Sequence, residues 1–360
     1  MTDWIQTISQ AMASVNRAVD AVKDSITHSL GIQDPINVLP YRGYGTPERL
    51  YLKGRVLRDE GIKLREQHAP LWKNLWSMYK RFETDEVVHA HLRVSLGNFQ
   101  QEIETDDEGF FEVTIQPQPA IDDDRLWQPI DLELLQPQPP PCQGHDRAQA
   151  LVVHNQARFG VISDIDDTIV YTAATDVLKM IRIAYLGNSK TRKPFDGVAE
   201  FYHALQQGQN GEGNPIFYVS SSAWNMYDLF AEFMDFNQIP PGPILLRDIE
   251  LAPDNLLSFK HERYKLEQIQ PIFENFPQLQ FILIGDSGQK DAEIYRNLAN
   301  TYPNRILAVY IRNVTPNNRQ RDRELEAIAT DIKEQGGQLV VFNDTSEAMA
   351  HAASQGWIAT

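Results

Sequence analysis

The chain has 360 residues, of which 42% are hydrophobic and 23% charged, and its formal net charge at pH 7 is −16. This length and composition predict a globular protein of two domains or slightly more. The acidic balance excludes general nucleic-acid binding, which requires a basic surface.

The N-terminal segment over 3–30 carries apolar side chains at alternating spacings of three and four, the heptad pattern of an amphipathic helix. The apolar positions are Ile5, Ile8, Met12, Val15, Val19, Val22 and Ile26. We expect a helical unit over 1–34 that docks against its own chain or against a dimer partner. A helix lying on a membrane is the alternative, although three aspartates offset the two basic residues of its polar face.

Residues 35–116 are predicted to be rich in β structure. Strands are expected over 50–57, 87–94, 101–105 and 110–115. The last two flank the turn Asp106-Asp107-Glu108-Gly109 and are expected to form a hairpin. Short strands at this spacing predict a small β-sandwich, interrupted by a helical segment over 71–82.

Seven prolines and the acidic run Asp122-Asp123-Asp124 fall between 117 and 148. Proline at this density prevents regular structure and stiffens the chain. We therefore expect a linker over 117–150 and a new domain over 151–360.

In this C-terminal domain, short apolar strands alternate with helical segments. The strands are expected over 159–163, 216–219, 244–246, 281–284, 306–311 and 339–342. Near-continuous apolar strands separated by helices predict a Rossmann-like α/β fold, a parallel sheet with helices on both faces. Ligands of such sheets bind beyond the carboxyl ends of the strands, so the residues that follow each strand are decisive.

Acidic and hydroxyl residues follow three of these strands. The first strand is followed by Asp164-Ile165-Asp166-Asp167-Thr168, the second by Ser220-Ser221-Ser222 and the fourth by Gly285-Asp286-Ser287-Gly288-Gln289-Lys290-Asp291. Lys265 lies in the helical segment before the fourth strand. Four chemically matched groups therefore converge on one edge of one sheet.

Asp-x-Asp-x-Thr, a strand-end serine, a helical lysine and Gly-Asp-x-x-x-x-Asp, in this order, resemble the four motifs of the haloacid-dehalogenase phosphatases. Four segments make the resemblance more specific: Thr175–Met180, Tyr218–Asn225, Pro240–Arg247 and Gly285–Asp291. They are similar to the catalytic-domain family typified by the fungal actin-patch phosphatidate phosphatase, over about 158–315. The preceding β region is similar to that of bacterial members.

This resemblance implies a magnesium site and a nucleophile. Mg²⁺ prefers hard oxygen ligands and is commonly held by one or two carboxylates. The side chains of Asp164 and Asp286 and the backbone carbonyl of Asp166 would bind it, with Asp291 holding a metal-bound water or the lysine. Asp164 would attack phosphorus and form an aspartyl-phosphate. Asp166 would be the general acid and base.

The resemblance also assigns the remaining site residues. Ser220 would hydrogen-bond a phosphoryl oxygen, and Lys265 would pair with the nucleophile and the phosphate. Lys260 is the rival for the lysine role. Thr168 and Ser221 are expected to bind substrate.

Single motifs of this kind are weak signals, because acidic triplets are common on loops and at helix N-caps. We interpret Asp122-Asp123-Asp124 as a solvated run and Asp167 as a helix cap. His203 and His261 have no partner at ligand spacing and are interpreted as surface or core residues. The ordered set of four motifs is the stronger indication.

The segment over 176–196 is both basic and strongly apolar, in an acidic protein. Lys179 and Arg182 are its candidates for substrate binding. Apolar side chains beside a basic fringe suit acyl chains and a phosphate headgroup. Packing of the same apolar side chains on the sheet is the alternative.

No apolar run approaches the roughly 20 residues of a transmembrane helix, and the N-terminus lacks the features of a secretory signal. We expect a cytoplasmic protein, with peripheral attachment to a membrane left open. The function expected is Mg²⁺-dependent hydrolysis of phosphatidate to diacylglycerol and phosphate at a membrane surface. A phosphatase of phosphoproteins or soluble metabolites, and a non-catalytic module that binds a partner or membrane, are the alternatives.

Overall fold

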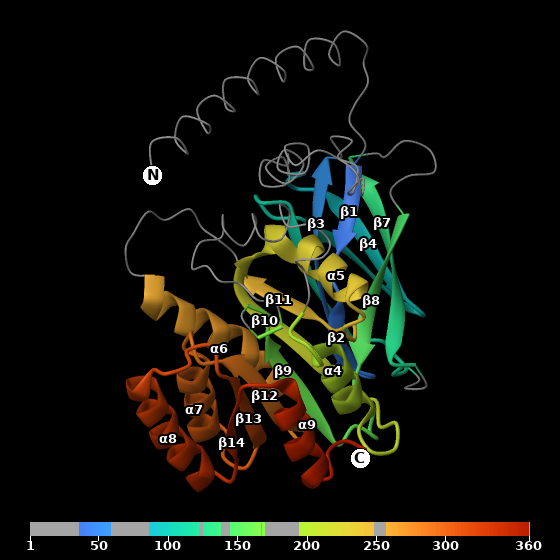
Figure 1. Ribbon diagram of the computed structural model, residues 1–360. Helices are drawn as coiled ribbons and strands as arrows, with labels where there is room; N and C mark the ends of the chain where they lie inside the picture. Colours follow the sequence, from blue (N-terminus) through green and yellow to red (C-terminus); the bar gives the residue numbers. More distant parts are fainter. Residues whose placement is uncertain are drawn as a thin grey trace, which may run out of the picture.

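A computed structural model describes the chain over 36–58, 86–121, 125–137, 145–166, 168–169, 194–247 and 257–359 (Figure 1). Several predicted features lie outside the described residues: the helices over 3–30 and 71–82, Asp122–Asp124, Asp167, Lys179 and Arg182. The side chains of Lys260 and His261 lie outside them as well. None of the described helices is long and apolar enough to span a membrane.

The first sheet is mixed and encloses one hydrophobic core. Its spatial order is β1 (Ile36–Pro40), β3 (Arg49–Arg58), β2 (Gly43–Thr46), β8 (His145–Val152), β7 (Trp127–Gln136), β4 (His91–Leu96) and β5 (Phe99–Glu104), with β6 (Phe110–Ile115) paired to β3. Leu92, Val94 and Leu96 of β4 alternate with more exposed residues, so one face of the strand is buried. These residues pack in one cluster with buried residues of β1, β3 and β6. The strands thus enclose a common core, as in the predicted β-sandwich, but they belong to a single sheet.

The predicted hairpin between 101–105 and 110–115 is wrong. Strand β5 pairs with β4, and strand β6 pairs with β3 at another part of the sheet. The turn at Asp106–Gly109 does form, with the Gly109 N–H donating to the Asp106 carbonyl (3.0 Å), but it links strands that do not pair. The actual hairpin joins β4 to β5 through Gly97 and Asn98, where Gly97 has the positive φ (57°) that a two-residue turn demands.

The stretch over 117–150 also differs from the irregular linker expected from its prolines. Strands β7 and β8 lie largely within it and pair antiparallel. Pro129 is tolerated within β7 because the pairing of β7 with β4 ends at Asp131, which leaves Pro129 with a neighbour on one side alone. The apolar alternation of Ile130, Leu132 and Leu134, all buried, therefore outweighs the proline count.

The second sheet has six parallel strands and confirms the six predicted strands. Its order is β11 (Ile244–Arg247), β10 (Ile216–Ala223), β9 (Phe159–Asp164), β12 (Gln280–Asp286), β13 (Ile306–Arg312) and β14 (Leu339–Phe342). The chain proceeds outward from β9 to β11 on one side and from β12 to β14 on the other. In open sheets of this order, the crevice lies at the carboxyl ends of the central strands.

Helices cover both faces of the parallel sheet (Figure 1). One layer holds α4 (Val198–Gln207), α5 (Tyr227–Phe236) and α9 (Thr345–Ser354), and the other holds α6 (Leu257–Asn275), α7 (Asp291–Thr301) and α8 (Arg319–Glu334). Ile282 and Ile284 of β12 pack in the first layer, whereas Phe281 and Leu283 pack in the second. Alternate residues of this buried strand thus pack against helices on opposite faces of the sheet, which confirms the predicted α/β arrangement.

Aromatic and polar contacts join the two sheets. The Tyr41 ring lies 4.6 Å from that of Trp224, nearly parallel, and 4.3 Å from that of Tyr227. Arg55 of β3 donates a hydrogen bond to the Asn225 side chain (3.2 Å). Trp224 and Asn225 belong to the short 3₁₀ helix η1 (Trp224–Met226), directly after β10. The first sheet, β1 to β8, which we call the β domain, therefore contacts the edge where a ligand is expected.

Replacing Tyr41 with alanine is expected to lower the free energy of unfolding by about 3 kcal/mol, because a buried ring is removed from two aromatic partners. Urea unfolding measures the change. Phe236→Ala is the matched control, since that ring is 68% exposed, and it should shift stability by less than about 0.5 kcal/mol. Equal stability of the two variants would show that Tyr41 does not hold the sheets together.

Candidate active site

Asp164 is the last residue of β9 and is 1% exposed. Strand alternation directs it toward the α6 layer, on the side of Ile162. From α6, the Lys265 ammonium lies 2.6 Å from Asp164 Oδ1 as an ion pair. The Thr168 hydroxyl donates to the other carboxylate oxygen (3.3 Å). The nucleophile predicted from sequence is thus held between a buried cation and a hydroxyl.

The same lysine bridges to a second carboxylate. Lys265 donates to Oδ1 of Asp291, the first residue of α7, at 2.5 Å. The second oxygen of Asp291 accepts from the backbone N–H of Asp286 (3.1 Å). Gly285 is required here, because a Cβ at this position would lie 2.6 Å from the Asp291 carboxylate. Asp291 therefore fixes both the lysine and the loop that carries Asp286.

The Asp286 carboxylate is anchored through one oxygen only. Backbone N–H groups of Gly288 and Gln289 donate to its Oδ1 at 2.6 and 2.9 Å. Its Oδ2 is buried and accepts no hydrogen bond from any described residue. A buried carboxylate oxygen without a donor costs free energy unless a cation binds it.

Three carboxylates and one lysine make this site strongly acidic. Asp164, Asp286 and Asp291 each offer an oxygen, and these oxygens lie within 4.8 Å of one another. Burial raises the pKa of Asp164 well above its usual value, although Lys265 partly offsets this effect. Burial and the Asp291 charge raise the pKa of Asp286 to about 7. Burial opposes the charge of Lys265, but Asp164 and Asp291 outweigh it and raise the pKa of the ammonium.

This donor set fits a divalent cation. Carboxylate oxygens are the ligands that Mg²⁺ prefers, and the unpartnered oxygen of Asp286 faces an excess of negative charge. Lys265 alone cannot neutralise three carboxylates.

Asp166 is oriented separately from this triad. The Ser220 hydroxyl donates to Asp166 Oδ2 (2.7 Å), and the Ser222 N–H donates to the Ser220 oxygen (3.0 Å). The backbone carbonyl of Asp166, predicted to bind the metal, accepts a long hydrogen bond from the Gln289 side chain (3.4 Å). The hydroxyl oxygen of Ser221 is buried and has no hydrogen-bond partner among the described residues. In the structure, Ser220 therefore contacts Asp166, the residue expected to be the general acid.

Two arginines that sequence reasoning missed donate hydrogen bonds to the loops that carry the acidic residues. Arg312, at the end of β13, donates to the Thr168 carbonyl (3.3 Å) and to the Thr345 hydroxyl (3.1 Å). Arg321 donates to the Ser287 carbonyl (2.9 Å) and to the Gln289 carbonyl (3.0 Å). For Arg312 the available signal was a charged residue at the end of a buried apolar strand. Arg321 lies in a charge-rich helix that gives no such sign.

The fold and the site together define a Rossmann-like α/β domain with a carboxylate-rich centre at the carboxyl edge of its sheet. Residues 159–313 match the family model described as "Phosphatidate phosphatase APP1, catalytic domain". The chain is 36% identical over 155 residues to the phosphatidate phosphatase APP1 of Saccharomyces cerevisiae, covering 43% of this chain and 26% of that protein. The family predicted from the sequence motifs is confirmed.

An uncharacterised protein of Schizosaccharomyces pombe is 25% identical over 157 residues, covering 43% of this chain and 25% of that protein. The chain thus spans about a quarter of the length of these relatives. Among solved structures, a carbohydrate acetylesterase from Xanthomonas citri is similar at a TM-score of 0.27 and 12% identity, over 82% of this chain and 65% of that one. A likeness at this score carries no functional argument.

Lys265→Met is expected to lower the free energy of unfolding by about 3 to 5 kcal/mol, because it leaves buried carboxylates without their cation. Urea unfolding in the presence of a chelator measures this loss. Lys333→Met, at an exposed position of α8, is the control and should change stability by less than about 0.5 kcal/mol. A Lys265 variant as stable as the control would contradict the proposed charge balance.

Chelator-treated protein is expected to lose stability as the pH rises from 5 to 8. The pKa of Asp286 is about 7 in the folded protein and lower in the unfolded chain, so the folded state binds more protons over this interval. The stabilisation is complete below the unfolded pKa and is lost as the pH passes about 7. Urea midpoints across the range should fall less in Asp286→Asn than in Asp322→Asn, an exposed control on α8. The same pH dependence of the midpoint in both variants would rule out this assignment.

Proposed function

We propose that the protein is a Mg²⁺-dependent phosphatase of the haloacid-dehalogenase type that hydrolyses phosphatidate to diacylglycerol and phosphate. The observation that carries the proposal is the buried Asp164 carboxylate, 2.6 Å from Lys265 and clustered with the unpartnered oxygen of Asp286. The catalytic-domain family of residues 159–313 and the named activity of the yeast relative support the choice of reaction and substrate.

Charge neutralisation comes first in this mechanism. A phosphate ester is an anion and repels a carboxylate nucleophile. Asp164 and Asp286 would hold Mg²⁺, and the bound ion supplies positive charge for the phosphoryl oxygens. Lys265 adds a second positive charge beside the attacking oxygen, and Asp291 keeps the ammonium in that position.

The chemistry then uses two aspartates in turn. Asp164 Oδ forms a bond to phosphorus as the ester P–O bond breaks, which yields an aspartyl-phosphate and a leaving alkoxide. Asp166 gives its proton to the alkoxide, and Ser220 orients this carboxyl by its 2.7 Å hydrogen bond. A water molecule then attacks the aspartyl-phosphate and returns a proton to Asp166. Inorganic phosphate leaves and Asp164 is regenerated.

The positions of Thr168 and Ser221 support assisting roles for both residues. Thr168 holds Asp164 Oδ2, which directs the other oxygen toward phosphorus. Ser221 has a buried hydroxyl free to bind a substrate oxygen. Lys179 and Arg182 keep their proposed role at the lipid headgroup, and we propose cytoplasmic action at a membrane surface.

Asp164→Asn is expected to abolish phosphate release, with a loss on the order of 10⁴-fold or more, because the nucleophile is removed. The assay compares phosphatidate in mixed micelles, a phosphopeptide and soluble monoesters, each with Mg²⁺ or with chelator. Asp322→Asn should retain wild-type rates, and chelation should stop turnover of every substrate.

The same panel separates the proposal from its alternative. Phosphate release from phosphatidate far above that from the other esters supports the lipid assignment. Turnover of soluble esters without turnover of phosphatidate would reject it and leave a phosphatase of other monoesters.

A further inference from the structure

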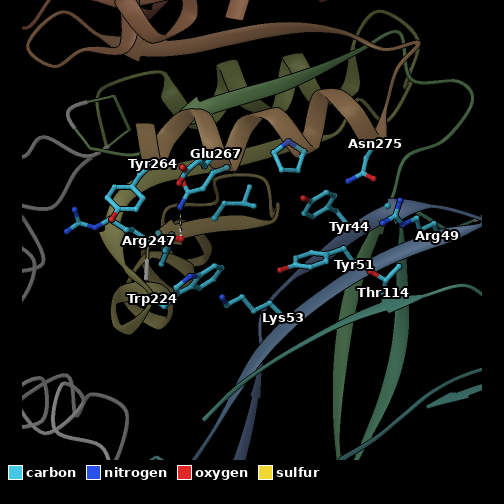
Figure 2. A pocket seen from close by; sticks show the side chains of 15 residues that line it. Tyr44, Arg49, Tyr51, Lys53, Thr114, Trp224, Arg247, Tyr264, Glu267 and Asn275 are labelled. Atoms are coloured by element: carbon cyan, nitrogen blue, oxygen red, sulfur yellow. Dashed lines mark hydrogen bonds between the residues drawn. The ribbon is translucent and has the colours of Figure 1, made fainter. Parts of the chain in front are cut away.

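A cavity of about 480 Å³ lies between the two sheets (Figure 2). One wall is formed by β2 and β3 of the β domain, and the opposite wall by α6 and the end of β11. Its size is that of a site for a drug-sized molecule, and such sites commonly lie between domains. We call it the interdomain groove.

The groove is mostly apolar along its walls. The rings of Tyr44 and Tyr51 line one side, Trp224 lies at the end near η1, and Leu245 and Pro271 face them from the α/β domain. Figure 2 shows the two tyrosine rings and Trp224 arranged along the length of the groove. The Trp224 ring is stacked on Tyr41 and lies beneath the Lys53 ammonium (5.0 Å), so the tyrosine rings, Leu245 and Pro271 offer the apolar surface for an extended hydrocarbon.

Polar atoms in the groove are left without partners at the end nearest the catalytic centre. The Nε of Arg247 is buried and has no hydrogen-bond acceptor among the described residues, while its guanidinium lies over the Tyr264 ring at 5.4 Å. The Gln268 amide donates to the Leu246 carbonyl (2.5 Å), which leaves its buried Oε1 without a described donor. A ligand that offers an acceptor to Arg247 would satisfy the first of these groups.

The groove and the catalytic centre share two structural elements. On α6, Lys265 contacts Asp164, and Gln268 lies one turn further along the same side of the helix. On the β10 side, Ser220 contacts Asp166, and Trp224 follows four residues later. Strand β11 lies two strands away from β9, about 10 Å at the usual strand spacing. Leu245 is level with Asp164 in the strand register, and Arg247 follows two residues later at the end of β11.

We propose that the interdomain groove binds the acyl-bearing body of the phosphomonoester whose phosphate is held at Asp164. This inference rests on the proposed phosphatase function and assigns a specificity site to it. The hydrocarbon packs on the tyrosine rings, Leu245 and Pro271, and Arg247 donates to an ester carbonyl oxygen. The β domain thereby selects substrates with an acyl chain over those that lack one.

The test uses the full chain and phosphatidates of increasing chain length, from dibutyryl to dioctanoyl, dispersed as monomers so that membrane binding plays no part. Glycerol 3-phosphate serves as the reference without acyl chains. The kcat/KM of the wild type is expected to rise about two- to fourfold for each methylene buried. This rise of kcat/KM with chain length should be clearly smaller in Tyr264→Ala.

Arg247→Gln is expected to lower kcat/KM for the acyl esters at least about tenfold more than for glycerol 3-phosphate, because the hydrogen bond from a charged donor is lost. Phe236→Ala and Arg323→Gln, both at exposed positions outside the groove, are the matched controls and should keep the wild-type chain-length slope. Groove variants with the wild-type slope and selectivity would overturn the proposal.

Two outcomes separate this proposal from the proposed function. A wild type that hydrolyses glycerol 3-phosphate but shows no chain-length dependence rejects the groove and leaves the phosphatase in place. Where no ester is hydrolysed, calorimetric titration with dihexanoyl phosphatidate decides the matter. Binding weakened at least about tenfold in both Tyr264→Ala and Arg247→Gln supports the groove, and unchanged affinity overturns it.

Discussion

The buried ammonium of Lys265, in contact with Asp164 and Asp291 at once, is the interaction on which the site depends. A buried charge is stable only when partners of opposite charge lie close to it in suitable geometry. The lysine comes from α6, one aspartate from the end of β9 and the other from the start of α7. One ion pair therefore sets the relative positions of three elements at the carboxyl edge of the sheet.

The remaining negative charge defines what else the site requires. Asp286 is held through one oxygen by two backbone N–H groups, and its other oxygen is buried without a described donor. Burial and the charge of Asp291 raise the pKa of Asp286 to about 7, although Lys265 and the two backbone N–H groups oppose the rise. A divalent cation would relieve both the excess charge and the unpartnered oxygen, so the donor set of the cluster suits such an ion.

Much of the α/β domain could be predicted because its signals are local. Each parallel strand is a continuous apolar run, and the acids at 164 and 286 directly end their strands. Signals that depend on distant partners were misread or missed. The turn at Asp106–Gly109 is present, but nothing local shows that its flanking strands pair elsewhere. The interdomain groove could not be foreseen, because Tyr44 and Tyr264 are far apart in the sequence.

Binding of a divalent cation between Asp164 and Asp286 is the central claim, and Mn²⁺ titration followed by electron paramagnetic resonance tests it most directly. One ion per chain should bind to the wild type and be displaced by excess Mg²⁺. Binding should weaken at least about tenfold in Asp286→Asn and be unchanged in Asp322→Asn. Equal Mn²⁺ binding by the wild type and Asp286→Asn would contradict the account.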